Sequence, residues 1–135
     1  MNPVTPTQLL ARLAALKVDR ASGDAAPHKP LLLLVVIELA EQALLPEKLL
    51  PLTPELAFRF FTYWSVVAHR RTQKPDVRYP FYHLQGDGCW TPLGEDGEPA
   101  HDRRLARCAQ LNPDFEARLN DPAFRDEARW LLICT

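Results

Sequence analysis

Four of the 13 prolines directly follow a residue type that favours the start of a helix. These pairs are Thr5-Pro6, Thr53-Pro54, Asn112-Pro113 and Asp121-Pro122. A Thr, Asn or Asp side chain at the N-cap accepts hydrogen bonds from the free amides of the first turn, and a proline at the first helical position has no amide to lose there. Each pair therefore predicts a helix that begins at its proline.

The predicted helices cover most of the chain. Those that start at a cap-and-proline pair span residues 6–18, 54–69, 113–119 and 122 to the last residue, and a further short helix is expected at 102–109. The segment 31–37 is apolar on every side, which predicts a central helix over 30–44. Val35, Val36 and Ile37 favour a strand in that segment, but its length favours the helix.

One segment departs from the helical pattern. Residues 79–85 and 89–93 are short and aromatic-rich, and Gly86-Asp87-Gly88 separates them. Two such runs around a glycine turn predict a β-hairpin. The expected fold class is therefore mainly α, a compact helical domain with one small β-hairpin or sheet, and 135 residues fit a single domain over 1–135.

The net charge of −1 hides an uneven distribution of charge along the chain. The stretch 69–83 has only Asp76 to oppose its cations, which are Arg70, Arg71, Lys74 and Arg78. The next stretch, 86–102, is acidic and contains no Lys or Arg. A chain of nearly neutral total charge can therefore present a basic face, which is the electrostatic feature expected of a nucleic-acid partner.

The remaining composition is that of an ordinary globular chain. The longest apolar stretch, 31–40, is interrupted by Glu38 and is too short to cross a bilayer, so no membrane contact is expected. The N-terminus has no signal-peptide pattern, and the three widely spaced cysteines form no disulfide framework. These features predict a cytoplasmic protein.

The sequence shows no catalytic or metal-binding motif. Zinc sites need cysteines and histidines at short paired spacings, whereas those of this chain are scattered. The five glycines form no phosphate-binding loop. Cys89 and His83 could meet across the predicted hairpin as nucleophile and base, but a small buried thiol is the simpler interpretation. We therefore expect no catalytic residue, no metal and no cofactor, and a small hydrolase is the least favoured reading.

Pro27-His28-Lys29-Pro30 suits anion binding, because it lies directly before the most apolar helix. The free amides and the dipole at a helix N-terminus attract negative charge, and the His and Lys add donors there. An exposed polar loop is the equally weighted alternative.

The second pattern suited to binding is the aromatic segment that begins at Arg78. In the predicted strand, Tyr79 and His83 share one face, and Pro80 implies an edge strand that is open to a ligand. The basic residues that lead into it give an alternation of cations and aromatics, which suits nucleic acid. A basic surface loop before a core hairpin is the alternative.

These segments carry a recognisable combined pattern, with Gly88-Cys89-Trp90 after them. In full it is Pro27-His28-Lys29-Pro30-Leu31-Leu32-Leu33-Leu34, then Tyr79-Pro80-Phe81-Tyr82-His83-Leu84 and Gly88-Cys89-Trp90. It resembles the sulfur-binding domain of McrA-like HNH restriction endonucleases. The resemblance implies a helical fold with a small sheet that binds double-stranded DNA carrying a backbone phosphorothioate. It also implies a shallow apolar cavity for the sulfur, ringed by phosphate-binding polar groups.

The resemblance also assigns roles to single residues. His28 and Lys29 match the polar pair beside the modified phosphate, and many relatives have arginine at the second of these positions. Lysine keeps the charge but lacks the bidentate fork of arginine. Tyr79 and Pro80 match the apolar wall of the cavity, and His83 falls near a position where some relatives have a small residue. The charge pattern, and not the resemblance, assigns the neighbouring phosphates to Arg70, Arg71, Lys74 and Arg78.

The nuclease of this family requires a His-rich ββα-metal motif, and no such spacing occurs in this sequence. In the longer proteins it follows this domain, and the chain ends abruptly on an apolar helix, so a C-terminal nuclease domain is expected in a full-length protein. The leading prediction is thus a non-catalytic targeting module of a modification-dependent restriction endonuclease in bacterial defence. The alternative is a helical protein-interaction domain of a defence or regulatory protein.

Overall fold

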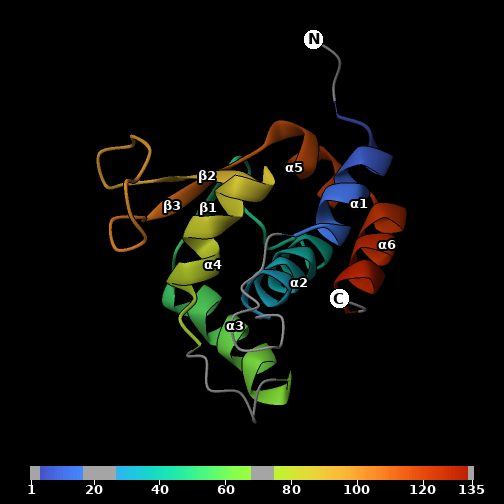
Figure 1. Cartoon of the computed structure of the whole chain (residues 1–135), viewed down its shortest axis with the longest axis horizontal. Helices are drawn as coiled ribbons and strands as arrows, with labels where there is room; N and C mark the ends of the chain where they lie inside the picture. The colour runs from blue at the N-terminus through green and yellow to red at the C-terminus, as the bar shows by residue number, and fades with distance from the viewer. Residues whose placement is uncertain (1–3, 17–26, 68–74, 134–135) are drawn as a thin grey trace.

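The computed structural model describes residues 4–16, 27–67 and 75–133. They form helices and a small antiparallel sheet (Figure 1). The helices are α1 (Pro6–Ala14), α2 (His28–Glu41), α3 (Pro54–Val67), α4 (Arg78–His83), α5 (Pro113–Leu119) and α6 (Pro122–Ile133), with a 3₁₀ turn, η1 (Leu84–Asp87). The strands are β1 (Leu49–Pro51), β2 (Trp90–Leu93) and β3 (Cys108–Leu111). The predicted fold class, mainly α with a small sheet, is confirmed.

All four cap-and-proline pairs begin helices, as predicted. At α1, the Thr5 hydroxyl accepts from the Gln8 amide at 3.1 Å while the Gln8 side chain accepts from the Thr5 amide at 2.9 Å. Thr53, Asn112 and Asp121 each accept from an amide two or three residues further on, at 3.2, 2.9 and 3.0 Å. The predicted ends of the first and third helices, at 18 and 69, and the last two residues of the chain lie outside the described residues.

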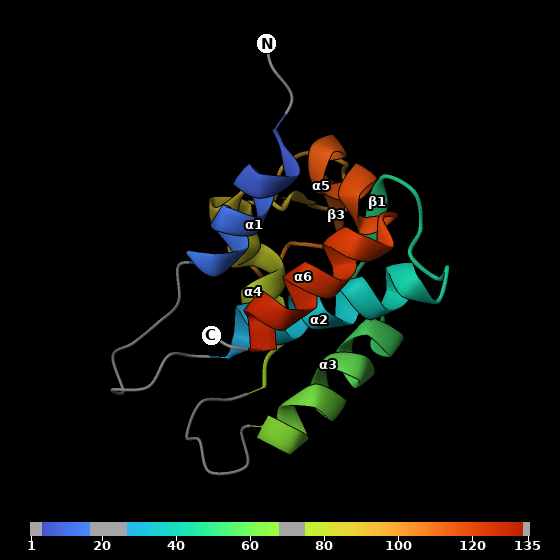
Figure 2. The same cartoon turned by 90° about the vertical axis from the view of Figure 1, so that its right-hand side faces the viewer.

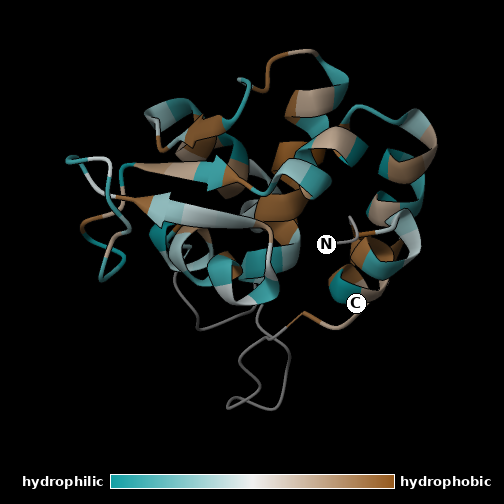
Figure 3. Ribbon diagram, turned by 90° about the horizontal axis from the view of Figure 1, so that it is seen from above, coloured by the Kyte–Doolittle hydropathy of each residue, from teal (hydrophilic) through white to brown (hydrophobic). Residues whose placement is uncertain are grey.

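Helix α2 is the centre of the molecule, as its apolar sequence predicts. Leu32, Leu33, Val35 and Val36 have no exposed surface, and α3, α4 and α6 pack around the helix (Figure 2). Figure 3 shows the hydrophobic residues concentrated in the central helices and a largely hydrophilic loop beyond the sheet. The helix begins at His28, two residues before the predicted start, so the His-Lys pair belongs to its first turn.

The sheet has the order β1-β3-β2, and both pairings are antiparallel. Its central strand overturns the helix predicted at 102–109, because residues 108–111 pair on both sides. Ala109 lies opposite Leu50, and Gln110 lies opposite both Leu49 and Thr91. Residues 102–107 form turns, in which the Asp102 carboxylate accepts from two following amides. Long-range strand pairing thus outweighs the local helical preference of the segment.

The hairpin predicted from 79–85 and 89–93 is also wrong in its first half. Residues 78–83 form α4 and 84–87 form η1, and only 90–93 is a strand, which pairs with β3. The Asp76 carboxylate accepts from the Arg78 amide at 3.0 Å at the start of this turn of helix. Pro80 is in the first turn, where no helical amide is required. The proline therefore marks the start of a helix and not the edge of a strand.

Candidate nucleic-acid interface

The first turn of α2 places two polar residues against the protein interior. His28 is 7 % exposed and Lys29 is 6 % exposed, and they are the buried polar or charged residues of the described chain. The N-cap residue Pro27 makes no side-chain cap hydrogen bond, and no acidic residue occurs in the first turn. No acidic side chain of the first turn therefore offsets the partial positive charge of the helix dipole at the N-terminus of α2.

Four rings from three helices meet beside this turn. The imidazole of His28 lies with its centroid 4.7 Å from the Trp64 ring of α3 and 5.1 Å from the Tyr79 ring of α4. Tyr79 in turn lies 4.6 Å from His83, one helical turn further along α4. The predicted site residues His28, Tyr79 and His83 are therefore brought together. Trp64 joins them, although it was not among the predicted site residues.

Lys29 is held by a carboxylate that sequence reasoning did not assign to the site. Its Nζ lies 2.6 Å from Oδ2 of Asp87 in η1, and the two side chains are 7 % and 4 % exposed. Removing two charges from water costs several kcal/mol per ion, so such a pair is retained only with close geometry. Asp87 occurs between two glycines, which indicated a turn and gave no sign of an ion pair with a residue 58 positions away.

The remaining predicted residues divide into three groups. Pro80 is among the side chains with less than 2 % exposure, so its ring faces the core. Arg78 is exposed and forms an ion pair with Asp76 at 3.2 Å. Arg70, Arg71 and Lys74 lie outside the described residues.

The charges around His83 identify its neighbours. Burial lowers the pKa of His83 below its ordinary value of 6.5, and the positive charges of Lys29 and Arg103 lower it further. Arg103 belongs to the long connection between β2 and β3 and was not among the predicted site residues. The sequence contains no signal for it, because only the fold brings that connection to α4.

Cys89 does not have the properties of a nucleophile. It is 3 % exposed, and burial, with a smaller effect of the Asp87 carboxylate, raises its pKa to about 12. A thiol with this pKa is protonated at neutral pH, and the thiolate is the reactive form. The predicted hairpin across which Cys89 and His83 could meet does not form, because α4 and η1 occupy its first half. The structure therefore does not support the hypothesis that Cys89 and His83 act as nucleophile and base in a hydrolase.

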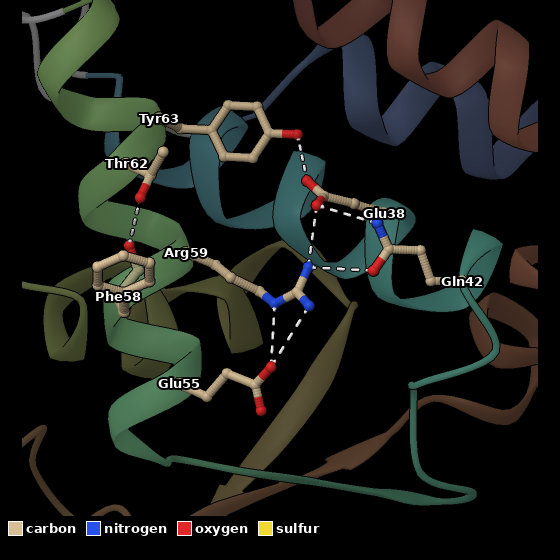
Figure 4. A network of polar contacts seen from close by, with 7 residues as sticks. All are labelled: Glu38, Gln42, Glu55, Phe58, Arg59, Thr62 and Tyr63. Carbon is tan, nitrogen blue, oxygen red and sulfur yellow. Dashed lines mark hydrogen bonds and ion pairs between the residues drawn. The ribbon is translucent and has the colours of Figure 1, made fainter.

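A polar network joins α3 to α2 (Figure 4). Arg59 donates to Glu38 at 2.9 Å and to Glu55 at 3.3 Å, and the Tyr63 hydroxyl donates to Glu38 at 2.5 Å. Burial and the Glu38 carboxylate raise the pKa of Tyr63 to about 12. The carboxylate of Glu38 thus has its partners within the protein, and we assign this network to the packing of the two helices.

Two further observations concern the described residues alone. Within 4–16, 27–67 and 75–133, no three or more His, Cys, Asp or Glu side chains lie close enough together to hold a metal ion. In the same ranges, no helix combines the length and the apolar character that a bilayer crossing requires.

Comparison with solved structures shows a similarity in the fold. No protein-family model and no curated protein matches the chain. A solved structure, the sulfur-binding domain of ScoMcrA complexed with phosphorothioated DNA, superimposes with a TM-score of 0.67 at 22 % sequence identity. The match covers 93 % of this chain and 84 % of that one. The chain therefore has the fold of that sulfur-binding domain.

Proposed function

We propose that this chain binds double-stranded DNA carrying a backbone phosphorothioate. One observation carries the proposal: nearly the whole chain has the fold of a domain solved with such DNA. The ring cluster beside the first turn of α2 supports it, because it combines apolar surface with a fixed cation. The domain serves as the targeting module of a modification-dependent restriction endonuclease whose nuclease lies C-terminal to it.

The chemical basis of the preference is the different solvation of sulfur and oxygen. Sulfur is larger and accepts hydrogen bonds poorly, so its transfer from water to an apolar surface costs little. An anionic oxygen without partners loses several kcal/mol in the same transfer. A site that offers rings instead of donors therefore discriminates by penalising ordinary phosphate. Because the two non-bridging positions are stereochemically distinct, one diastereomer directs its sulfur to the rings.

We assign different roles to the predicted residues. Tyr79 and His83 lie on the accessible side of α4 and supply the ring surface, whereas Lys29 supplies a charge that Asp87 holds in place. His28 packs between Trp64 and Tyr79 and sets the position of the tyrosine ring. Pro80 acts from beneath, by fixing the first turn of α4.

The decisive experiment compares duplexes that differ in one sulfur atom. Fluorescence-anisotropy titrations use a pool of duplexes with randomised flanking base pairs, prepared with the Rp linkage, the Sp linkage or ordinary phosphate. The expected result is tighter binding to one phosphorothioate diastereomer than to the other two pools. Equal affinity for all three pools contradicts the proposal.

A protein-interaction domain is the second candidate. Large apolar side chains are exposed on α3 and α6, with Phe58 at 70 %, Val66 at 72 % and Trp130 at 69 %. Exposed apolar side chains of this size are available for contact with a protein partner. This candidate gains support if none of the three duplex pools is bound.

A further inference from the structure

The connection between β2 and β3, residues 94–107, is anchored along its length by backbone hydrogen bonds. The Gly94 amide donates to the Glu98 carbonyl at 2.8 Å, and the Ala100 amide donates to Pro92 at 2.9 Å. At its end, the Arg107 amide donates to the Leu93 carbonyl at 2.8 Å. These bonds fix the backbone of the connection, which extends beyond the ends of β2 and β3 (Figure 1).

The returning half of this connection lies against α4. The Tyr82 hydroxyl donates to the His101 carbonyl at 2.9 Å, which joins the connection to the helix that carries Tyr79 and His83. The next residue, Asp102, accepts from the Arg104 and Leu105 amides at 2.7 and 3.2 Å. Arg103 is the exposed residue that follows Asp102 in this turn, and its positive charge acts on His83 of α4.

Two arginines of this connection have different environments. The Arg107 guanidinium donates to the carbonyls of Arg104 and Ala106, at 2.8 and 3.1 Å, and so stabilises the turn itself. Arg103 is exposed, and within the described ranges it forms no ion pair. Its charge is close enough to His83 to lower the pKa of that imidazole.

Charge is separated along the connection. The acidic residues Glu95, Asp96 and Glu98 are exposed in the first turn of the connection, which directly follows β2 and contains Gly97 with a φ of 80°. Arg103 is in the second turn, after Ala100 has returned to the sheet at Pro92. A polyanion is attracted to the second turn and repelled from the first, so this arrangement favours one orientation of a bound duplex.

We propose that Arg103 binds a DNA phosphate next to the linkage contacted by the Tyr79 and His83 rings. The assignment rests on the proposed function, because it takes the ring cluster as the place where the duplex lies. It adds a phosphate contact from the β2–β3 connection to those expected from the basic segment before α4. Arg103 positions the duplex and adds affinity without reading the sulfur.

The test is a salt series of anisotropy titrations with phosphorothioate and plain duplexes. Arg103→Ala should lower affinity for both duplexes by the same factor, about five-fold near 0.15 M salt, and reduce the log–log salt slope by about 0.9. The preference for sulfur should persist. Arg103→Lys should restore most of the slope, because an ammonium also releases a counterion. Arg103→Gln gives the same readout as the alanine variant with less change in volume.

Arg118→Ala is the matched control. It makes the same change in net charge on α5, which packs against α2 and α6, and it should leave the slope unchanged. If the unaltered protein prefers sulfur but Arg103→Ala keeps the full slope, the Arg103 assignment is overturned and the proposed function stands. If the unaltered protein binds both duplexes equally, the sulfur reading fails, and a reduced slope in Arg103→Ala still supports the contact. No binding to either duplex overturns both.

Discussion

Replacing Asp87 with asparagine should destabilise the folded protein far more than replacing a surface carboxylate. The substitution keeps the shape of the side chain but leaves the Lys29 ammonium, which is 7 % exposed, without the carboxylate that lies 2.6 Å from it. A buried charge without its partner has lost water and gained no counter-charge. The cost appears in the free energy of unfolding, because the unfolded chain solvates Lys29 in both variants.

The magnitude follows from burial and chain length. Breaking a buried ion pair by removing one partner costs about 3–5 kcal/mol. A chain of 135 residues has an unfolding entropy of about 0.28 kcal/mol/K, at ~2.1 cal/mol/K per residue, so the lower figure corresponds to a fall in Tm of about 10 °C. The double variant Lys29→Met, Asp87→Asn should recover much of this loss, because it removes the unpaired charge.

The assay is thermal and urea unfolding followed by circular dichroism, with Asp126→Ala as the matched control. Asp126 also pairs with an arginine, at 3.3 Å, but its side chain is 78 % exposed. An exposed pair of this kind contributes less than about 1 kcal/mol. If Asp87→Asn shifts Tm no more than Asp126→Ala, or if the double variant is as unstable as the single one, the Lys29–Asp87 pair does not hold the site together.

Three further predictions concern the site and the buried thiol. Tyr79→Ala should reduce the preference for phosphorothioate over plain duplex by about 1–3 kcal/mol, measured as the ratio of the two Kd values, and an unchanged ratio would place the sulfur elsewhere. For both duplexes, DNA affinity should rise as pH falls through the range below 6.5 in which His83 becomes protonated, because the negative charge of a bound duplex favours the imidazolium, whereas the neutral ring faces the sulfur at neutral pH. His83→Gln should flatten this dependence, and an equally steep profile in that variant argues against a bound phosphate near His83. Cys89, with a pKa of about 12, should resist a thiol reagent at pH 8 until urea unfolds the protein, as peptide mapping can show; labelling in the native state contradicts its burial.

Helix starts were predictable because their signals are local. Thr5 and Thr53 each cap the helix that their proline begins, and the atoms involved lie within three residues of each other. The central position of α2 was predictable for a related reason. A segment that is apolar on every side has no face to present to water and must be surrounded.

The segment from Tyr79 to Gln85 could not be assigned correctly from its residue types alone. Aromatic residues and a proline fit an edge strand and also fit the first turns of a short helix. The hydrogen bond from the Arg78 amide to the Asp76 carboxylate and the packing of α4 on α2 favour the helix. The error had limited effect on the site, because residues four apart share a face of a helix as residues two or four apart share a face of a strand. Tyr79 and His83 therefore remain neighbours, while Pro80 turns inward.

Asp87 and Arg103 could not be predicted as site residues, because their partners are distant in the sequence. Asp87 pairs with Lys29, which is 58 positions away in the sequence. The connection that carries Arg103 contacts α4 where the Tyr82 hydroxyl donates to the His101 carbonyl. No spacing rule for a single sequence connects such positions. The sequence shows that both residues are charged. However, the composition around Asp87 indicated only an acidic turn, and that around Arg103 indicated only a short helix.

The position of the first turn of α2 explains why a polar pair is buried in an otherwise apolar core. The body of the helix is surrounded by other elements, so its first turn meets the edge of the same packed interior beside α4. Leucine at positions 28 and 29 would fill this space at lower cost in desolvation. The chain instead places an imidazole among rings and an ammonium against a buried carboxylate. A phosphorothioate is an anion with one poorly hydrated atom. In the function proposed above, that atom meets the rings beside the first turn of α2 and the negative charge meets the ammonium that Asp87 holds, so the pair would serve recognition as well as packing.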